Sequence, residues 1–419
     1  MNFSDSDDDA AFRAELIEWL ESNSQPRAED LIGSVRVYAR AEDEAASIED
    51  QRYWQRALFL GGWAAITWPK AYGGRDATAT QAMIFREELS RFEIPNLSVF
   101  LIGHGMIGPT IITHGTEDQR ARYISPLAEG RELWCQLWSE PNAGSDLASL
   151  ETRADLDPAT GEWVLRGQKV WTTYAHAADW GLCLARTNPD VPKHAGLSVF
   201  IVNMKAPGVT VRPLRQITGD SEFNEVFFDD VRLAADSVVG GLNDGWRVAI
   251  TTLMNERYAG GLMGDLTELV RPLFELSSSA PIGSGGSFES SDVRQELGRA
   301  FTEAKLISLT GYRSLSKLAK SESPGPEGSI LKLCFANLTS KVALLGMRLL
   351  GLASLDQGPS AQDGGVWPMA YLTTQASRIA GGTDDVMRNI IAERVLQLPK
   401  EYSLNAKISF REAQAASNR

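Results

Sequence analysis

The sequence predicts an α+β protein in which a helical N-terminal part, a β-rich middle part and a helical C-terminal part follow one another. Over roughly the first 130 positions, apolar residues such as Phe12 and Leu16 recur at helical spacing. Across residues 133–242 the pattern changes to short apolar runs separated by Gly, Pro and Asp turns. The helical spacing returns after Asn243, so helices and strands are segregated rather than alternating.

The composition is that of an ordinary folded protein and excludes several classes. At roughly 100 to 200 residues per domain, the 419 residues predict two to four domains. Hydrophobic residues make up 43% and charged residues 23% of the chain, close to the globular average, which argues against a disordered or fibrous protein. The formal net charge of −13 repels phosphate and anionic lipid at long range, so we expect neither nucleic acid nor a membrane surface as the main partner.

Membrane insertion, export and metal binding are not expected either. The apolar stretch Val342–Leu355 is interrupted by Gly and Arg and is shorter than the roughly 18 residues that span a bilayer. Residues 4–9 are acidic where a targeting segment would be basic, which favours a cytoplasmic protein. The four histidines lie far apart and form no metal-binding pair. The cysteines have no CxxC spacing, so we expect neither a disulfide framework nor a zinc site but three buried thiols (Cys135, Cys183 and Cys334).

Helix boundaries follow from capping residues and from Gly, Pro and Asn. In the N-terminal part the expected helices are Thr80–Phe92, Leu97–His114 and Glu117–Ala128, with Thr116 as the N-cap of the last. The C-terminal part predicts three long helices, which indicate a four-helix-type bundle: Trp246–Leu276, Asp292–Lys320 and Ser329–Leu355. The segments between them are poor in structure-forming residues and are expected to be exposed connections: Ser277–Ser291 and Asp356–Gly365.

The middle part predicts a β-barrel or sandwich made of short strands. The expected strands are Trp163–Leu165, Gly181–Arg186, Leu197–Val202, Val209–Val211 and Glu225–Phe228. The predicted domains are therefore an N-terminal helical domain over 1–132, a middle β-barrel over 133–242 and a C-terminal four-helix bundle over 243–419.

Chemical function is indicated first by the segment at the entrance to the middle part, Gln136–Leu147. Its turn formers, which include Gly144 and Ser145, expose backbone N–H groups and hydroxyls that suit a phosphate or the edge of a heteroaromatic ring. Taken alone, such a loop is more often a plain turn between domains, since no P-loop or GxGxxG is present.

A second segment, Gly167–Thr173, combines an indole with hydroxyls. On a strand, Trp171 and Thr173 could stack against a planar cofactor and hydrogen-bond its edge. A Trp in a sheet is by itself more often core, so this segment alone does not decide the function.

Together with four further segments, these two resemble the acyl-CoA dehydrogenase family over nearly the whole chain. The six matches follow the family's order, which makes coincidence a poor explanation. They are Trp68–Gly74, Gly115–Gln119, Gln136–Leu147, Gly167–Thr173 with Ala177–Gly181, the barrel segments Ser198–Leu214, Glu222–Asp230 and Gly245–Trp246, and Gly381–Thr383 with Arg388–Arg394. The resemblance implies the acyl-CoA dehydrogenase fold, with FAD held between the domains and across a subunit contact.

The resemblance also implies roles for individual residues around FAD. Ser139 corresponds to a hydroxyl contact with the flavin ring, and Gly144 and Ser145 lie where flavin phosphate and substrate meet. Trp171 would lie against the isoalloxazine, and Thr173 would hydrogen-bond the N5 edge that accepts hydride.

The same resemblance locates the catalytic base. The family reaction removes a proton beside a thioester carbonyl, and a desolvated Glu is a suitable base. Most members carry this Glu just before the Gly-Thr of the closing motif, where this chain has Gly381. Isovaleryl-CoA and long-chain acyl-CoA dehydrogenases place it before an Arg after the barrel, and Glu256 with Arg257 is similar to that pattern.

Four assignments follow from this second base position. Glu256 is expected to be the base, with apolar neighbours such as Val248 to desolvate it, and Arg257 is expected to bind the CoA end. The Gly381 N–H would polarise the thioester carbonyl, and Thr383 would approach the flavin from the C-terminal bundle.

Two features depart from the family pattern near the FAD phosphates. The Arg-x-x-Phe-Gly element is absent, with Ser277–Ser291 in its place, and the usual Ser-Glu-Ile-Gln has become Asp384–Met387. Two added carboxylates would disfavour a pyrophosphate close to them.

The resemblance implies α,β-dehydrogenation of an acyl-CoA to the trans-2-enoyl-CoA, as in fatty-acid β-oxidation. Electrons would pass to an electron-transfer flavoprotein, and the assembly would be a homodimer, a homotetramer or a heterotetramer. Two alternatives are a non-catalytic partner subunit of a heteromeric dehydrogenase and a flavin oxidase or monooxygenase. The presence of Glu256, Trp171 and Ser139 favours a catalytic chain. The preference for chain length, branching or a steroid side chain does not follow from the sequence.

Overall fold

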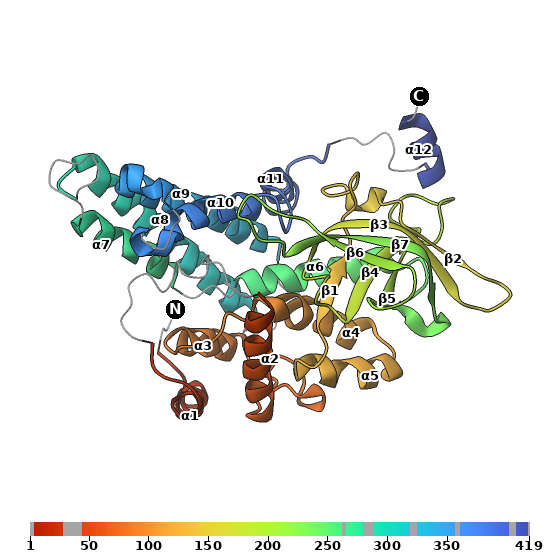
Figure 1. Ribbon diagram of the computed structural model, residues 1–419, viewed down its shortest axis with the longest axis horizontal. Coiled ribbons are helices and arrows are strands. Elements are labelled where there is room, and N and C mark those ends of the chain that lie inside the picture. Colours follow the sequence, from red (N-terminus) through yellow and green to blue (C-terminus); the bar gives the residue numbers. More distant parts are fainter. Residues whose placement is uncertain are drawn as a thin grey trace. The chain divides into compact units, whose positions relative to one another are not determined.

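The computed structural model describes residues 4–27, 44–261, 265–279, 288–318, 325–356, 361–401 and 408–417 (Figure 1). Helices come first, strands second and helices third, which confirms the predicted α+β class. The chain forms two compact units, each assembled from separated segments. The first unit comprises Met1–Ser47, Asp76–Asn96 and Arg257–Leu398, and the second comprises Ile48–Arg75, Leu97–Glu256 and Pro399–Arg419.

One sheet organises the second unit. Its strands within the described residues are β1 (Trp134–Leu137), β2 (Arg153–Leu156), β3 (Trp163–Thr173), β4 (Trp180–Arg186), β5 (Leu197–Asn203), β6 (Val209–Pro213), β7 (Phe223–Leu233) and β8 (Val238–Val239). They lie in the order β6-β7-β3-β2-β4-β5-β8, and β1 pairs with β4. The β1–β4 and β2–β4 pairs are parallel and the others antiparallel.

All five expected strands are present, but β3 and β7 are much longer than their apolar runs. They pair with each other from Trp163–Leu233 to Thr173–Phe223, so backbone pairing rather than side-chain hydrophobicity determines their length. Strand β5, next to the edge strand β8, is almost wholly buried, which agrees with its continuous apolar sequence.

An apolar core of the second unit joins residues of its helices, such as Ile111 and Ile124, to strand residues such as Leu184. The helices of this unit are α2 (Glu44–Leu60, whose first residues belong to the first unit), α4 (Gly108–His114), α5 (Glu117–Ala128), α6 (Gly245–Gly261, which continues into the first unit) and α12 (Phe410–Ser417). Thr116 caps α5 as expected, with a reciprocal hydrogen bond from Gln119. The expected helix Leu97–His114 is helical from Ser98 onward, but it begins as a 3-10 turn (Ser98–Phe100) and contains a π-helical turn (Gly103–Ile107) before α4.

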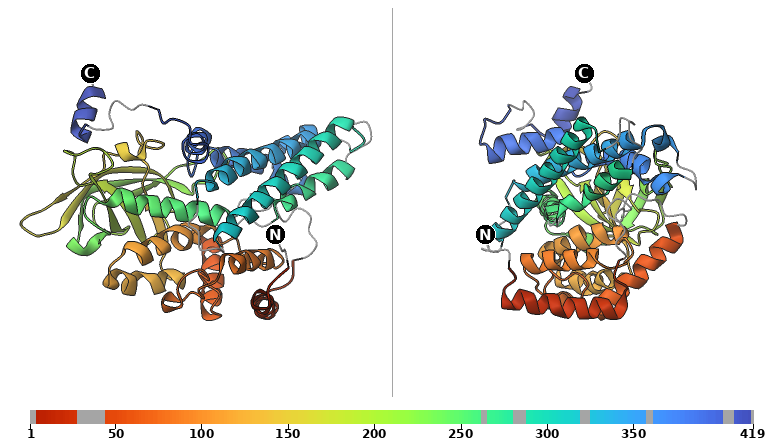
Figure 2. Two further views of the ribbon diagram at one scale, coloured as in Figure 1. Left: turned by 180° about the vertical axis from the view of Figure 1, so that it is seen from behind. Right: turned by 90° about the vertical axis from the view of Figure 1, so that its left-hand side faces the viewer.

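The first unit is a set of helices around an apolar core of leucines and Trp367. Its helices are α1 (Asp7–Asn23), α3 (Ala79–Ser90), α7 (Arg271–Ser279), α8 (Ser291–Leu318), α9 (Gly328–Leu350), α10 (Val366–Ser377) and α11 (Asp384–Ile390). Helix α9 packs against both α8 and α10, as the two views of Figure 2 show.

The prediction of one helix over Trp246–Leu276 was wrong. Helix α6 ends at Gly261, and a 3-10 turn over Leu266–Leu269 precedes α7. Glycines at 260, 261 and 264 weaken the helix, and the Asp265 carboxylate accepts the Thr267 N–H as a new N-cap.

Helix α9 bears on two expectations, that no segment spans a membrane and that Cys334 is buried. Gly328–Leu355 is long and apolar enough, with a mean hydropathy of 1.4, to qualify by composition as a membrane span, which the sequence reading had excluded. In the structure its residues Leu331, Leu338 and Val342 belong to the core of the first unit, so it is accounted for as a core helix. Cys334 on the same helix is exposed rather than buried, because only one face of α9 points into the core.

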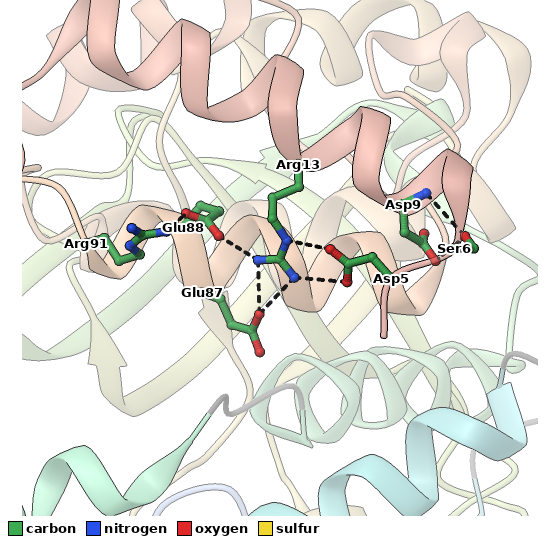
Figure 3. Close-up of polar contacts among 7 residues, drawn as sticks. All are labelled: Asp5, Ser6, Asp9, Arg13, Glu87, Glu88 and Arg91. Atoms are coloured by element: carbon green, nitrogen blue, oxygen red, sulfur yellow. Dashed lines mark hydrogen bonds and ion pairs between the residues drawn. The ribbon is translucent and has the colours of Figure 1, made fainter. Parts of the chain in front are cut away.

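A charge cluster joins α1 to α3 within the first unit (Figure 3). The Arg13 guanidinium lies 2.5 Å from the Glu88 carboxylate and 2.7 Å from that of Asp5. The second Glu88 oxygen accepts a 2.7 Å bond from Arg91. Glu88 is therefore a buried carboxylate with two cationic partners, and Arg13 holds the pKa of Asp5 below its usual value through their hydrogen bond.

Candidate active site

The loop that follows β1 is fastened to β3 by a buried ion pair. The Lys169 ammonium lies 2.8 Å from the Glu140 carboxylate and 2.9 Å from the Trp138 carbonyl oxygen. The same carboxylate accepts the N–H groups of Glu151 at 2.6 Å and Thr152 at 2.9 Å. Burial alone would raise the pKa of Glu140, but the charge of Lys169 and these hydrogen bonds hold it below the ordinary value. Glu140 is therefore a structural carboxylate rather than a proton acceptor.

The backbone at Gly144 and Ser145, where the sequence predicts a donor-rich edge, is exposed. Glu140 and Ala143 exchange backbone hydrogen bonds of 3.0 and 3.1 Å, which makes residues 140–143 a tight turn. Both Gly144 and Ser145 are exposed beyond it, and a Cβ added to Gly144 would meet no atom within 4 Å. A ligand group can therefore approach this backbone closely.

Asp146, next to that edge, is neutralised by the β4–β5 loop. Both of its carboxylate oxygens lie 2.7 Å from the Lys193 ammonium. Although burial acts to raise the pKa of Asp146, its bonds with Lys193 and Ser149 lower it overall. The acidic residue thus adds no unpaired negative charge beside Gly144.

Trp171 is not a core residue, contrary to the default reading of a Trp in a sheet. Between Lys169 and Thr172, β3 has one residue more than β7, so the strand bulges there. Trp171 lies in this bulge with a left-handed φ of 60° and is 61% exposed. Its indole makes an edge contact with Phe223, with the ring centroids 6.1 Å apart. The bulge therefore presents a broad aromatic face outward.

Ser139 and Thr173 both lie close to Trp171 along the chain or through a backbone hydrogen bond. Thr173 is two residues further along β3, and Ser139 bonds the residue before Trp171. The Val170 N–H donates to the Ser139 carbonyl at 2.9 Å, which brings the loop after β1 alongside the bulge. Both Ser139 and Thr173 are half-buried. The neighbouring Thr172 hydroxyl is buried and has no hydrogen-bond partner among the described residues.

These five residues carry the kinds of group that a planar ring with a polar edge requires. Trp171 offers a flat exposed face, Ser139 and Thr173 offer hydroxyls, and Gly144 with Ser145 offers open backbone. All five lie in the second unit. Within the described residues, no group of three or more His, Cys, Asp or Glu side chains could hold a metal ion.

Glu256 lies in the last turns of α6, where it is half-buried. Upstream, Val248 is fully buried, and the Thr252 hydroxyl lies 2.9 Å from that of Thr110. Among the neighbours expected to desolvate Glu256, Leu253 is half-buried, whereas residues 262 and 263 lie outside the described residues. The side chain of Arg257 is outside them as well.

Gly381 and Thr383 lie in the first unit, in the connection between α10 and α11. Gly381 and Gly382 have φ values of 64° and 96°. Thr383 is the N-cap of α11, and its hydroxyl accepts the Val386 N–H at 3.2 Å. This structural role had not been predicted from the sequence.

The two carboxylates that depart from the family motif are both paired. Asp384 is buried and lies 2.7 Å from the Arg378 guanidinium, and Asp385 lies 2.8 Å from that of Arg388. The negative charge expected to disfavour a pyrophosphate is therefore offset locally.

Sequence reasoning missed the residues that hold the site in place. Lys169 and Glu140 were both visible in the two informative segments, and a charged residue inside an apolar strand is a signal for a buried pair. Lys332, which donates to the Gly382 carbonyl at 2.5 Å, had no such signal, since it is one of many lysines on helices.

The segregated helices and sheet place the protein among the α+β proteins. Models of the acyl-CoA dehydrogenase N-terminal, middle and C-terminal domains match residues 6–131, 135–231 and 243–396. The chain therefore belongs to the acyl-CoA dehydrogenase family, a family of flavoproteins, and is an oxidoreductase acting on acyl-CoA.

Two curated relatives carry the same description, one of similar length and one much longer. The chain is 38% identical over 396 residues to acyl-CoA dehydrogenase IpdE1 of Mycobacterium tuberculosis, covering 93% of this chain and 98% of that protein. It is 41% identical over 367 residues to acyl-CoA dehydrogenase FadE34 of the same organism, covering 87% of this chain and 48% of that protein.

Solved structures of the family share the fold. The Tcur3481-Tcur3483 steroid ACAD matches with a TM-score of 0.78 and 25% identity, covering 96% of this chain and all (100%) of that one. The ChsE4-ChsE5 complex from Mycobacterium tuberculosis matches with a TM-score of 0.77 and 27% identity, covering 96% and 100%.

Proposed function

We propose that the protein catalyses FAD-dependent α,β-dehydrogenation of an acyl-CoA thioester to the trans-2-enoyl-CoA and passes electrons to an electron-transfer flavoprotein. The observation that carries this proposal is the bulge that presents Trp171 outward beside Ser139 and the open Gly144 backbone. FAD, when bound, supplies the hydride acceptor. The residues that would hold it are Ser139, Gly144, Ser145, Trp171, Thr173 and Thr383.

Glu256 is the residue that takes the α-proton of the substrate. Its half-buried position in α6 supports this role, because partial desolvation strengthens a carboxylate as a base. The Gly381 N–H polarises the thioester carbonyl, and its lack of a hydrogen-bond partner among the described residues supports its availability as a donor. Ser145 and Arg257 contact the CoA portion of the substrate.

The proposed substrate carries a bulky, steroid-type acyl group. Two observations support this choice over a short linear chain. One matching structure is described as a steroid ACAD, and glycine at position 381 leaves room where most members carry a Glu side chain.

Assembly into an oligomer, either of identical subunits or with a second related chain, completes the proposal. Leu344, Leu352 and Leu355 lie exposed on α9 and the turn after it, and a partner surface would remove this apolar area from water. A matching structure described as a ChsE4-ChsE5 complex supports the heteromeric form. A cytoplasmic location is part of this proposal.

The test is anaerobic bleaching of the bound flavin with a panel of short, long, branched and steroid-type acyl-CoAs. A yellow protein that a bulky acyl-CoA bleaches supports the proposal. A colourless protein identifies a non-catalytic partner subunit, and rapid re-oxidation by air identifies an oxidase.

Glu256→Gln then tests the base. We expect an unchanged flavin spectrum and a bleaching rate at least about a hundredfold lower, since a general base contributes on the order of 10² to 10⁴. Glu18→Gln, at an exposed position of α1, is the matched control and should bleach at the wild-type rate. Equal rates for the two variants would reject Glu256 as the base.

A further inference from the structure

The two ends of the connection between α10 and α11 are bonded to each other through Arg378 and Asp384. The Arg378 guanidinium binds the Asp384 carboxylate at 2.7 and 2.8 Å, and the Asp384 N–H donates to the Arg378 carbonyl at 3.1 Å. On the α10 side, the Ala380 N–H donates to the Ala376 carbonyl at 2.9 Å. Both ends of the turn that carries Gly381 are therefore fixed.

The middle of this turn consists of two glycines, whose backbone has more conformational freedom than that of other residues. Gly381 and Gly382 are consecutive and both left-handed, and glycine has more backbone freedom to lose than any other residue. A Cβ at Gly382 would come within 2.5 Å of the Met387 methyl group, so a side chain cannot stiffen that position without moving Met387. Some other contact must hold the turn if the Gly381 N–H is to point in a constant direction.

Lys332 supplies that contact from a neighbouring helix. It lies on α9, which packs against α11, and its ammonium donates to the Gly382 carbonyl at 2.5 Å. A charge-assisted hydrogen bond of this kind is roughly twice as strong as a neutral one. The Ala380 N–H is bonded on one side and the Gly382 carbonyl on the other. The two peptide groups of Gly381 therefore lie between two peptide groups that are each held by a hydrogen bond.

We infer that Lys332 is a positioning residue for the reaction: by fixing the Gly382 carbonyl it orients the Gly381 N–H. The inference rests on the proposed function, in which that N–H polarises the thioester carbonyl. Donors that are fixed before the reaction stabilise developing charge without reorganisation, so loss of the anchor acts on the chemical step. Lys332 itself has no catalytic contact in this scheme.

Hydrogen exchange tests the anchor without depending on activity. In Lys332→Met we expect amide exchange within residues 380–387 to accelerate by about tenfold, because the Asp384 and Met387 N–H groups are bonded within this turn. Lys341→Met, on the same helix, is the matched control, since Lys341 is exposed and binds Glu303. Equal exchange of residues 380–387 in the two variants would overturn the inference.

Kinetics then test the consequence. Lys332→Met should lower kcat by roughly ten- to a hundredfold with KM changed by less than about threefold, in line with the cost of misplacing one donor. Lys332→Arg keeps a charged donor and should restore most of kcat, and Lys341→Met should match wild type.

The outcomes are distinguishable. If Lys332→Met loses its thermal transition, Lys332→Ala replaces it, since alanine also lacks a side-chain donor and suits a helix; kcat and exchange equal to those of Lys341→Ala would refute the anchor. A wild-type protein that no acyl-CoA bleaches would reject the proposed function instead, and the exchange experiment would still decide whether Lys332 holds the turn.

Discussion

A buried titratable side chain whose pKa is shifted by folding makes the free energy of unfolding depend on pH, and His104 is such a residue. His104 stacks on Phe100 with ring centroids 5.2 Å apart, and its Nε2 lies 2.7 Å from the Leu127 carbonyl oxygen. Burial lowers the pKa of this histidine to about 4, although the hydrogen bond to Leu127 acts in the opposite direction. In the unfolded chain a histidine titrates near 6.5, so between these values the unfolded state binds the extra proton.

Stability should therefore fall as the pH drops from about 6.5 towards about 4. From pH 7 to pH 5 we expect His104 to contribute a loss of about 2 kcal/mol in the free energy of unfolding. Urea unfolding at both pH values, compared between wild type and His104→Gln, isolates this contribution from the other histidines. An equal pH dependence in both proteins would show that His104 is not the cause.

The buried pair of Lys169 and Glu140 gives a second prediction. Lys169→Met leaves the Glu140 carboxylate buried without its cation, and breaking such a pair costs about 3 to 5 kcal/mol. Lys205→Met is the control, because Lys205 is 74% exposed and pairs with Asp179, so its loss should cost at most about 1 kcal/mol. Urea unfolding measures both, and similar losses would contradict the structural role of the pair.

Among the elements, the C-terminal helix α12 had no counterpart in the sequence reading. Its Phe410 ring lies 3.5 Å from the Arg186 guanidinium, and the Phe410 N–H donates to the Val191 carbonyl at 2.9 Å. Arg186 in turn donates to the carbonyls of Ala148 at 2.7 Å and Leu150 at 3.2 Å. Helix α12 thus covers the arginine that supports the end of the loop carrying Gly144.

Phe410→Ala should destabilise the protein by roughly 2 to 4 kcal/mol, because it removes a buried ring and its contact with a cation. Arg411→Ala, on the same helix as Phe410, is the control. It removes only an exposed ion pair with Asp190 and should cost at most about 1 kcal/mol. Thermal unfolding compares the two, and equal shifts would show that Phe410 is not the anchor of α12.

Sequence patterns predicted the centres of elements better than their ends. The strands around Gly181–Arg186 and Leu197–Val202 were visible because they are buried on both faces and continuously apolar. The bulge at Trp171 was not visible, since it depends on the register with β7 rather than on residue type. Serine and glutamate at positions 409 and 412 do form a capping box, but only docking makes a helix of eight residues stable.

In the whole molecule, exposed leucines on α9 and the following turn predict an assembly. Replacing Leu352 and Leu355, which are 87% and 74% exposed, by Glu should reduce the particle mass measured by light scattering after size-exclusion chromatography. Leu156→Glu, at an exposed position of β2, is the control and should leave the mass unchanged. A double variant of wild-type mass would place the subunit contact elsewhere.

At this scale the sequence was informative about identity and less so about geometry. The order of six short motifs was enough to indicate the family, which the domain matches confirm. Roles for Glu256, Gly381 and Thr383 rest on that resemblance and are still predictions. Contacts between residues far apart in the chain, such as Lys332 with Gly382, could not be predicted, because they depend on how helices pack.

Because β3 has one extra residue between Lys169 and Thr172, the direction of the Trp171 indole depends on the number of residues in this interval as well as on their types. Side chains alternate along a strand, so deleting Val170 would remove the bulge between Lys169 and Thr172 and turn the indole towards the other face. Homologous chains with the same residues but one fewer between Lys169 and Thr172 would hide the aromatic surface that this protein displays. The length of this short interval therefore determines the direction of the Trp171 indole as much as the residue type determines its shape.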